Sequence, residues 1–500
     1  MENLMGDRVL LIDEPMLQFC DGQRAADPHD GLALFGPFGT HSAAHPRSPA
    51  YVMLSTTCGI DLFARWAAAM NQAHAIEEPA KQRLWPPYPG FEIAFGSKWN
   101  ERPAWTFTID RDALILASRM RDPHERCFAV VDMFLEGFKQ ARKLDSTVVA
   151  ICVVPEEVWS NCRPESQVAS PIGRRLSQTQ KRSRRLGQSE LFEEFDPEQY
   201  QLSPDFRRQL KARTMKYDIP LQIFRESTLA LAENYEFGQR RLTPISDRMW
   251  NIGTALYYKC GGKPWRLDSA REGVCYIGIA FRLGRDSETA CCAAQMFLDS
   301  GDGIVFLAED QPFYSPETKQ FHLSKSAAKH LLSGVLETYK ALDGRPLTEI
   351  FLHYRSTISE EEFKGYESAC PPNAKIVGVR VRKDRFGPRL FRLGRMPVLR
   401  GTFWQTGNAA GYLYGSGFKP RVATYDGWEI PSPLSIDLQH GAAAIETIAR
   451  DILGLTKLNY NACRLGESQP VTIKFSDAVG EILISNPTIR EHRPNFKFYI

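Results

Sequence analysis

Several features that place a chain in a familiar class are missing from this 500-residue sequence. Its eleven cysteines include no CxxC pair, which favours buried thiols in a reducing compartment over disulfides or zinc binding. We find no uncharged apolar run of about 18 residues and no secretory signal, so we expect no membrane span. Together these absences predict a cytoplasmic protein.

Familiar catalytic signatures are missing as well. The sequence has no GxxxxGK[ST] loop, no Ser/His/Asp nucleophile pattern, no metal cage and no internal repeat. Its net charge of +3 points to no class of partner. A hydrophobic content of 43% and a charged content of 24% are ordinary for a globular protein, and the length allows two or three domains. The informative signals are therefore local.

The first region, residues 1–110, is rich in proline and glycine, as in "DEPMLQFCDGQRAADPHDGLALFGPFG". This composition predicts short strands broken by turns. We expect an extended, linker-like segment that packs on the rest of the chain and does not fold alone.

The second region, residues 111–265, alternates helix and strand. "HERCFAVVDMFLEGFKQARKL" has helical spacing, and "STVVAICVVPEEVW" is typical of a buried strand closed by Pro155. A helix follows with Ser203 as the expected N-cap and Pro204 at its first position, then a strand, then a helix stopped by the glycines at 261–262. This order predicts a small α/β domain.

The third region, residues 266–500, predicts an RNase H-like fold. Three strands, a helix, a strand, a helix and a strand are expected at 274–281, 293–298, 303–308, 324–342, 349–354, 359–369 and 375–383. A further helix is expected at 441–455, because its apolar residues have helical spacing.

An RNase H-like nuclease needs carboxylates at the ends of its first and fourth strands, which hold the metal ions. Those positions carry Ala280 and Ser356, and neither residue is a useful Mg²⁺ ligand. The sequence therefore predicts that hydrolysis has been lost. A shifted strand assignment would leave a different site built from neighbouring acids, namely Asp299, Asp302, Glu309 and Asp310. Turn formation explains the first two better.

Three basic stretches could contact a phosphate backbone. Arg207 and Lys211 are spaced i,i+4 and share a helix face, which predicts either a solvated surface or a phosphate site. Arg380 and Arg382 alternate on a strand within 379–395, which predicts either a nucleic-acid groove or a solvated edge strand. The six basic residues within 174–185 indicate a flexible loop or a backbone contact.

Several segments, in order along almost the whole chain, carry a resemblance to a known family. They are "VVPEEVW", "QLKARTMKYDIPLQIFRESTLA", "ALYYKCGGKPWRL", "GVCYIGIAFR", "ACCAAQMFLD", "DILGLTKLNYNAC" and "FKFYI". With these segments the sequence resembles a short prokaryotic Argonaute, which has a MID and a PIWI domain and lacks N and PAZ domains. It is most similar to the Argonaute subunit of short-Argonaute/TIR systems, whose members resemble inactive Argonautes. The resemblance implies a Rossmann-like MID domain at 111–265 and an RNase H-like PIWI domain at 266–500.

The resemblance also implies a pocket in the MID domain for the 5′-phosphate of a guide. Its residues would be Arg207, Lys211, Gln222 and Lys259, although many relatives have Tyr at the first position, and Lys259 lies far along the chain from Gln222. Gln222 interrupts the apolar strand "IPLQIF", so its amide needs partners. The α-carboxylate of Ile500 would help to hold a Mg²⁺ ion beside the phosphate. The apolar ending "NFKFYI" suits a buried tail, which could equally be a strand that only packs.

The function that the resemblance implies is guide-RNA-directed recognition of single-stranded DNA without cleavage. The partner would be a TIR-APAZ protein, forming a heterodimer that oligomerises on target binding and depletes NAD in prokaryotic antiviral defence. A sirtuin-like NADase or a nuclease could replace the TIR-APAZ protein as partner. Two different functions for the chain itself also stay open, that of an active nuclease with rearranged carboxylates and that of a scaffold that binds no nucleic acid.

Overall fold

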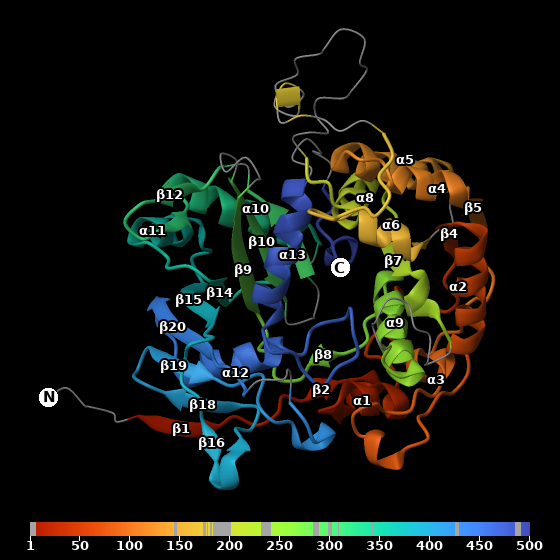
Figure 1. Cartoon of the computed structure of the whole chain (residues 1–500). Helices are drawn as coiled ribbons and strands as arrows, with labels where there is room; N and C mark the ends of the chain where they lie inside the picture. The colour runs from red at the N-terminus through yellow and green to blue at the C-terminus, as the bar shows by residue number, and fades with distance from the viewer. Residues whose placement is uncertain are drawn as a thin grey trace, which may run out of the picture.

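The computed structural model describes most of the chain. The described residues are 7–144, 148–173, 177, 179–180, 183, 202–231, 242–283, 290–298, 303–308, 310–342, 344–425, 430–485 and 492–500. Two sheets organise them, one parallel with four strands and one mixed with nine, and they occupy opposite sides of the molecule in Figure 1. No helix within these residues has the length and apolar character needed to cross a membrane.

The four-stranded sheet has the order β5-β4-β6-β7, and every pair in it is parallel. Its strands are β4 (Tyr51–Ser55), β5 (Trp105–Thr108), β6 (Val149–Val154) and β7 (Leu221–Arg225). All six residues of β6 are buried, as expected for a parallel strand covered on both faces. Alternate residues of this strand enter two separate apolar cores, so helices cover both faces of a Rossmann-like sheet.

The helices of this sheet divide between its two faces. Those packed on one face are α5 (Pro123–Ala141) and α8 (Phe206–Thr214), and those packed on the other are α2 (Thr57–Met70) and α9 (Ile245–Lys259). Two shorter helices, α4 (Arg111–Ser118) and α6 (Glu156–Asn161), lie beside the first pair. Helix α8 begins two residues after the expected proline, because Asp205 is the N-cap and its carboxylate accepts from the amide of Arg208 at 2.9 Å. The prediction that Ser203 caps this helix is wrong, since an aspartate caps equally well and lies nearer the first turn.

The first 110 residues divide between the two sheets. Strand β1 (Arg8–Leu11) pairs with β18 (Thr402–Gln405) at the edge of the nine-stranded sheet, as expected for a segment that packs on the rest of the chain. Strands β4 and β5, however, lie before the expected boundary at 110 and supply half of the parallel sheet. Composition did not indicate this, because parallel pairing joins residues about 50 apart in sequence and depends on non-local packing.

The nine-stranded sheet has the order β1-β18-β19-β20-β15-β14-β9-β10-β11. Its strands beyond the first two are β9 (Val274–Leu283), β10 (Ala290–Phe297), β11 (Gly303–Leu307), β14 (Glu349–Tyr354), β15 (Lys375–Lys383), β19 (Ala410–Leu413) and β20 (Leu434–His440). Three antiparallel strands lead to two parallel ones, which confirms the predicted RNase H-like order. Strand β15 lies inside the sheet between β14 and β20, so the possibility of a solvated edge strand is excluded.

Helices cover the nine-stranded sheet on both faces. On one face lie α10 (Lys325–Leu342) and α11 (Glu360–Ala369), close to their predicted limits. On the other lie α12 (Ile445–Leu455) and α13 (Val471–Ser485), which crosses the front of the sheet in Figure 1. Gly278 of β9 allows this crossing, because a Cβ atom there would lie 1.9 Å from the carbonyl oxygen of Thr472.

Candidate functional site

Two buried lysines from different helices meet at the end of the chain. Lys211 on α8 is 3% exposed and Lys259 at the end of α9 is 1% exposed. Both ammonium groups donate to the main-chain oxygen of Ile500, and that of Lys259 also donates to the carbonyl of Leu221 on β7 at 2.9 Å. The structure thus brings together three of the residues that the resemblance assigned to one pocket.

The chain end is held in place by the nine-stranded sheet. The amide of Val305 on β11 donates to the carbonyl of Pro494 at 2.7 Å. Phe496 packs against Phe475 of α13 with ring centroids 4.9 Å apart. Ile500 itself is 4% exposed, so the expected burial of the tail is confirmed. In Figure 1 the C-terminus lies between α13 and α8.

The pocket has a strongly positive character. Burial, then repulsion from Lys259 and Arg207, holds the pKa of Lys211 well below its usual range. Burial, then the charge of Arg207, lowers the pKa of Lys259 to about 7. Among the described residues, no carboxylate side chain contributes to either shift. The two ammonium groups share one main-chain oxygen of Ile500, and buried cations in excess of the anions beside them are costly, so the pocket is suited to a further anion.

The charge of Arg207 acts on both lysines, and Gln222 follows Leu221, whose carbonyl accepts from Lys259. Arg207 is half-buried, one helical turn before Lys211, and burial lowers its pKa. Its neighbour Arg208 points elsewhere, to Glu481 of α13 at 2.8 Å, so the two arginines have different surroundings. Side chains alternate between the two faces of β7. Leu221 and Ile223 enter the core on the α5–α8 side, so Gln222, which lies between them, points to the face that α9 covers.

The side chain of Gln222 is only partly satisfied. Its amide nitrogen donates to the carbonyl of Ile223 at 3.2 Å, whereas its amide oxygen is buried and has no hydrogen-bond partner among the described residues. This is the unsatisfied amide that the sequence pattern indicated, and a donor from a ligand would complete it.

The two expected nuclease positions lie at the same end of adjacent strands. Ala280 is on β9, and Ser356 follows the end of β14, which pairs with β9 in parallel through Gly278 and His353. Continuing this register by two residues places Ala280 opposite Arg355, next to Ser356. The two positions therefore lie at the same end of two adjacent parallel strands.

Of the four neighbouring acids considered as substitutes, the described part of the chain includes Asp310 alone. Asp310 pairs with His330 at 2.9 Å, and Asp299, Asp302 and Glu309 lie outside the described residues. His353 donates to or accepts from the hydroxyl of Thr472 at 2.9 Å, and burial lowers its pKa to about 3. A neutral, buried imidazole that is already hydrogen-bonded is a packing residue and a poor proton carrier.

The two arginines expected to contact a nucleic-acid backbone differ in their surroundings. Arg380 is paired with Asp437 of β20, with its Nε and Nη2 atoms 3.0 and 2.9 Å from one carboxylate oxygen. Arg382, two residues along β15, is exposed. The charge of Arg380 is therefore already compensated within the sheet. The six basic residues within 174–185 lie outside the described residues.

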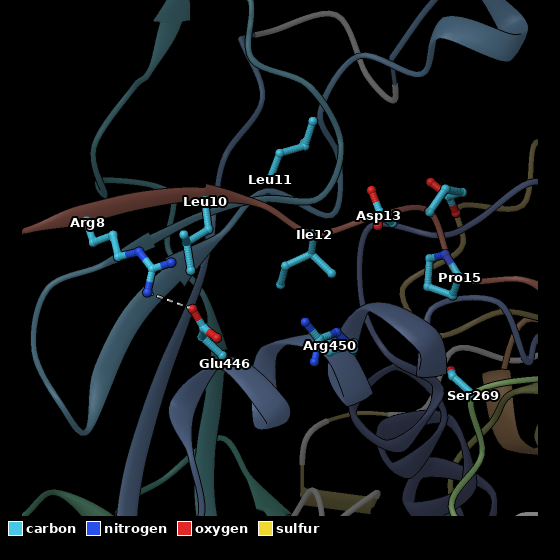
Figure 2. Close-up of a pocket in the computed structure, with 10 residues that line it drawn as sticks. Arg8, Leu10, Leu11, Ile12, Asp13, Pro15, Ser269, Glu446 and Arg450 are labelled. Atoms are coloured by element: carbon cyan, nitrogen blue, oxygen red, sulfur yellow. Dashed lines mark ion pairs between the residues drawn. The ribbon is translucent and has the colours of Figure 1, made fainter.

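A separate surface cavity of about 440 Å³ lies between β1 and α12 (Figure 2). Arg8 and Glu446 form an ion pair of 3.2 Å at one end of it, and Arg450 lies at its base. It shares no residue with the lysine pocket. Its polar groups do not converge on a common point in Figure 2, so we assign no chemistry to it.

Sequence reasoning missed a second buried cation pair, which anchors the start of the chain. Arg400 and Lys457 each lie 2.9 Å from a carboxylate oxygen of Glu14. Here a carboxylate side chain lies between the two cations and lowers the cost of burying them, whereas Lys211 and Lys259 share a main-chain oxygen of Ile500. No local pattern could have revealed it, because the partners are more than 380 residues apart in sequence.

Comparison with known proteins identifies the fold. No protein-family model and no curated protein matches the sequence. Clostridium butyricum Argonaute bound to a guide DNA and a 19-mer target DNA matches with a TM-score of 0.63 and 14% identity, over 97% of this chain and 54% of that one. Aa-Ago with externally bound siRNA matches with a TM-score of 0.54 and 13% identity, over 98% of this chain and 56% of that one.

A structure of A. aeolicus Argonaute gives a TM-score of 0.54 and 12% identity, over 95% of this chain and 53% of that one. This chain thus spans about half the length of the solved structures that it matches. The shared half is the α/β combination of a MID domain and an RNase H-like PIWI domain, so the predicted fold class is confirmed.

Proposed function

We propose that this chain binds the 5′-phosphate of a guide RNA in the pocket of Lys211 and Lys259 and uses the guide to recognise single-stranded DNA. The observation that carries the proposal is the pair of buried ammonium groups with no carboxylate side chain beside them in the described structure. Two Argonautes of similar fold support it, since one is bound to guide and target DNA and the other to siRNA.

Each residue of the pocket has a distinct role in this proposal. Arg207 would bind two phosphate oxygens through its planar guanidinium, while Lys211 and Lys259 add point charges. The buried amide oxygen of Gln222 would accept from the first nucleotide. With Ile500 as the C-terminal residue, three cations and one carboxylate leave about +2, which a phosphomonoester of about −2 neutralises.

A Mg²⁺ ion fits this pocket only in the presence of the guide. Ile500 offers the hard oxygen ligand that Mg²⁺ prefers, and the remaining ligands would be phosphate oxygens and water. Without those phosphates the ion would face two ammonium groups on the same oxygen. We therefore propose that Ile500 binds the metal ion only together with the guide. The ion would neutralise the backbone phosphates that follow the 5′-phosphate of the guide.

Recognition in this proposal ends without cleavage. Ala280 and Ser356 stand where metal-binding carboxylates would be needed, so the chain would hold the paired strands without hydrolysing them. Base pairing would read the sequence and the protein would read the backbone, as in other guided systems. Arg382, exposed on β15, would contribute to the backbone contact.

The output in this proposal comes from a second protein. On the sequence resemblance, we propose a cytoplasmic heterodimer with a TIR-APAZ protein that assembles on target binding and depletes NAD in antiviral defence. A sirtuin-like NADase as partner would also deplete NAD, whereas a nuclease would degrade nucleic acid and leave NAD intact. Expressing the chain with the protein encoded beside it, and measuring both NAD and intact DNA with and without target DNA, distinguishes an NADase partner from a nuclease partner.

The central test compares 5′-phosphorylated with 5′-hydroxyl RNA of one sequence. The double variant Arg207→Glu/Lys211→Glu should lose the preference for phosphate, because both changes reverse charge at the pocket. Lys216→Glu is the matched control, since Lys216 is exposed at the end of the same segment. Equal binding of phosphorylated RNA by the double variant and the control would refute the proposal. Short 5′-phosphorylated RNA should also copurify with the wild-type protein.

The hypothesis of an active nuclease has its own test. A labelled target is incubated with the guided protein and Mn²⁺. If the target is cleaved, and if Asp302→Ala abolishes that cleavage, the protein is a nuclease with a rearranged catalytic site. The proposal of recognition without cutting would then be wrong.

A further inference from the structure

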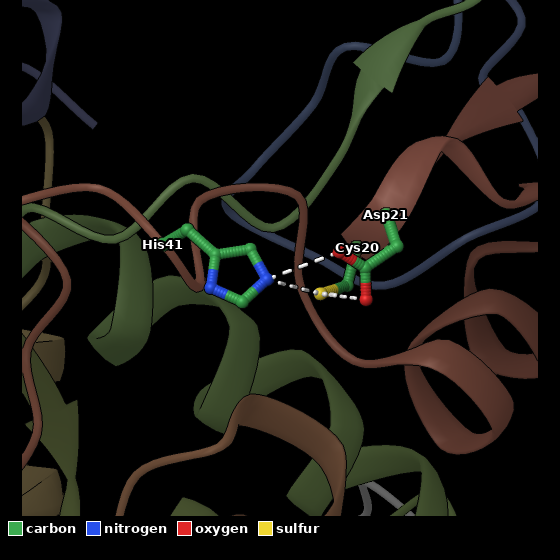
Figure 3. Close-up of side chains that lie close together, drawn as sticks. All are labelled: Cys20, Asp21 and His41. Atoms are coloured by element: carbon green, nitrogen blue, oxygen red, sulfur yellow. Dashed lines mark hydrogen bonds and ion pairs between the residues drawn. The ribbon is translucent and has the colours of Figure 1, made fainter.

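Three side chains with metal-binding atoms converge at the surface of the N-terminal region (Figure 3). Cys20 and Asp21 belong to a short turn (Cys20–Gly22) that joins β2 (Leu17–Gln18) to β3 (Arg24–Ala25), and His41 comes from the loop after α1 (Pro28–Phe35). Across the part of the chain that the structure describes, this is the one place where three such donors lie within 4.8 Å of one another.

The contacts within this group rule out a catalytic relay. The sulfur of Cys20 lies 3.5 Å from Nε2 of His41, and Oδ1 of Asp21 lies 3.1 Å from the same nitrogen. In a Cys–His–Asp relay the carboxylate would have to contact the other ring nitrogen, to orient the imidazole while it accepts the thiol proton. Here both groups compete for one nitrogen, so the arrangement does not activate the thiol.

The same contacts have the dimensions of a tetrahedral metal site. Typical bonds from zinc to sulfur, nitrogen and oxygen imply edges of about 3.6 Å for S···N, about 3.4 Å for N···O and about 3.6 Å for S···O. The observed separations are 3.5 Å for S···N, 3.1 Å for N···Oδ1 and 3.4 Å for S···Oδ2, so each of the other two ligand atoms contacts a different carboxylate oxygen of Asp21. A rotation of the exposed Asp21 carboxylate would present one oxygen to both, and a single ion would then contact all three side chains.

The backbone holds the ligands in place independently of their mutual contacts. The turn of Cys20 is closed by a hydrogen bond of 3.1 Å from the amide of Gln23 to its carbonyl. The loop of His41 is fixed through Gly39, whose amide donates to the carbonyl of Lys263 at 3.0 Å. Because β2 also pairs with β8 (Arg266–Leu267), both loops are attached to the same segment after α9.

The exposure of the three ligands suits an ion that keeps contact with solvent. The side chains of Asp21 and His41 are each 74% exposed, whereas Cys20 is buried beneath them. Burial and the nearby carboxylate raise the pKa of the Cys20 thiol, so the metal-free group is protonated at neutral pH. A divalent cation reverses this preference and releases the thiol proton to the solvent.

We propose that Cys20, Asp21 and His41 bind a zinc-like divalent ion through one sulfur, one oxygen and one nitrogen, with water at the fourth position. A mixed thiolate, imidazole and carboxylate set selects a borderline-soft ion such as Zn²⁺ over Mg²⁺ or Ca²⁺. The bound ion would join the β2–β3 turn to the loop after α1. This proposal does not depend on guide binding.

The test uses Co²⁺ as a spectroscopic substitute for Zn²⁺, with the full-length protein freed of any histidine tag. Titration should give one Co²⁺ per chain, a thiolate-to-cobalt charge-transfer band, and release of about one proton. Cys20→Ser should abolish the band. His41→Ala changes an exposed position, so the variant should fold. Changing an outer-shell partner of a metal costs up to about 100-fold in affinity, and the loss of a direct ligand should therefore weaken binding by at least about 100-fold.

Cys58→Ser is the matched control, because Cys58 is an exposed free thiol on α2. It should leave the band and the affinity unchanged. Competition with Zn²⁺ should remove the band, whereas excess Mg²⁺ should not. The proposal is overturned if Co²⁺ produces no charge-transfer band, if the band persists in Cys20→Ser, or if it disappears in Cys58→Ser. Unchanged affinity in His41→Ala would also overturn it.

Discussion

Raising the pH from 7 to 9 should weaken the preference of this protein for 5′-phosphorylated RNA, because the pocket must be protonated to bind a phosphate. Burial lowers the pKa of Lys259 to about 7 in the free protein. A phosphate beside the ammonium group would return that pKa towards the ordinary value of about 10.4. A group whose pKa rises on binding contributes fully to the binding free energy at pH values below its pKa in the unbound protein. That contribution decreases as the pH rises above this pKa.

The size of the effect follows from the protonated fraction. With a pKa of about 7, about half of the free molecules carry the proton on Lys259 at pH 7 and about one in a hundred at pH 9. The affinity for the phosphorylated end should therefore fall about 50-fold over these two units. Lys211 acts in the same direction, because its pKa is also lowered in the free pocket.

The assay measures dissociation constants for 5′-phosphorylated and 5′-hydroxyl RNA at several pH values and takes their ratio. Taking the ratio cancels contributions from the rest of the RNA, and the phosphate is almost fully ionised above pH 7. Calorimetry in two buffers of different ionisation enthalpy should show uptake of at least about one proton at pH 8, because Lys259 and Lys211 both have lowered pKa values in the free protein. In Lys259→Met the ratio should be smaller and less dependent on pH, while Lys216→Ala should behave as wild type. A ratio that stays constant from pH 7 to 9 in the wild-type protein would refute the reasoning.

Three further outcomes follow from the packing. Lys259→Met should raise the melting temperature of the RNA-free protein at pH 7, because it removes a buried amine. The melting temperature of the wild-type protein should increase from pH 7 to pH 9, since Lys259 keeps its proton in the unfolded state and loses it in the folded state, and this increase should be smaller in Lys259→Met. Gly278→Ala should destabilise the protein by about 1–3 kcal/mol in denaturant unfolding, since its Cβ would collide with the carbonyl of Thr472. Arg382→Ala should weaken binding of a guide–target duplex and flatten its salt dependence more than Arg380→Ala does, because the charge of Arg380 is already compensated; equal effects in filter binding would contradict this.

Local patterns predicted the main strands and helices between residues 274 and 383 well, but not strands β18, β19 and β20 or helix α13. The apolar face of α10 set its limits to within one residue, and the strand order 274–383 matches the sheet. Periodicity is sufficient there because each element buries a single face or a continuous apolar run. The first half was less predictable, since the short run 51–55 becomes a strand only through parallel neighbours from 105–108 and 149–154.

The candidate sites depended on contacts that no window of sequence contains. Lys259 and Ile500 were assigned to one pocket by resemblance alone, and the structure then placed them in contact. Arg380 resembled a free cation because its partner, Asp437, lies 57 residues further along the chain. Cys20 and His41 are separated by 21 residues without a recognised motif, so only the folded structure shows that they are neighbours.

The chain end bridges the two halves of the molecule. It is fastened to β11 of one sheet through Pro494, while its last residue receives the ammonium groups of two helices that cover the other. A ligand in that pocket would therefore contact groups that are fixed to both halves, so its binding would favour the packed arrangement of the two sheets.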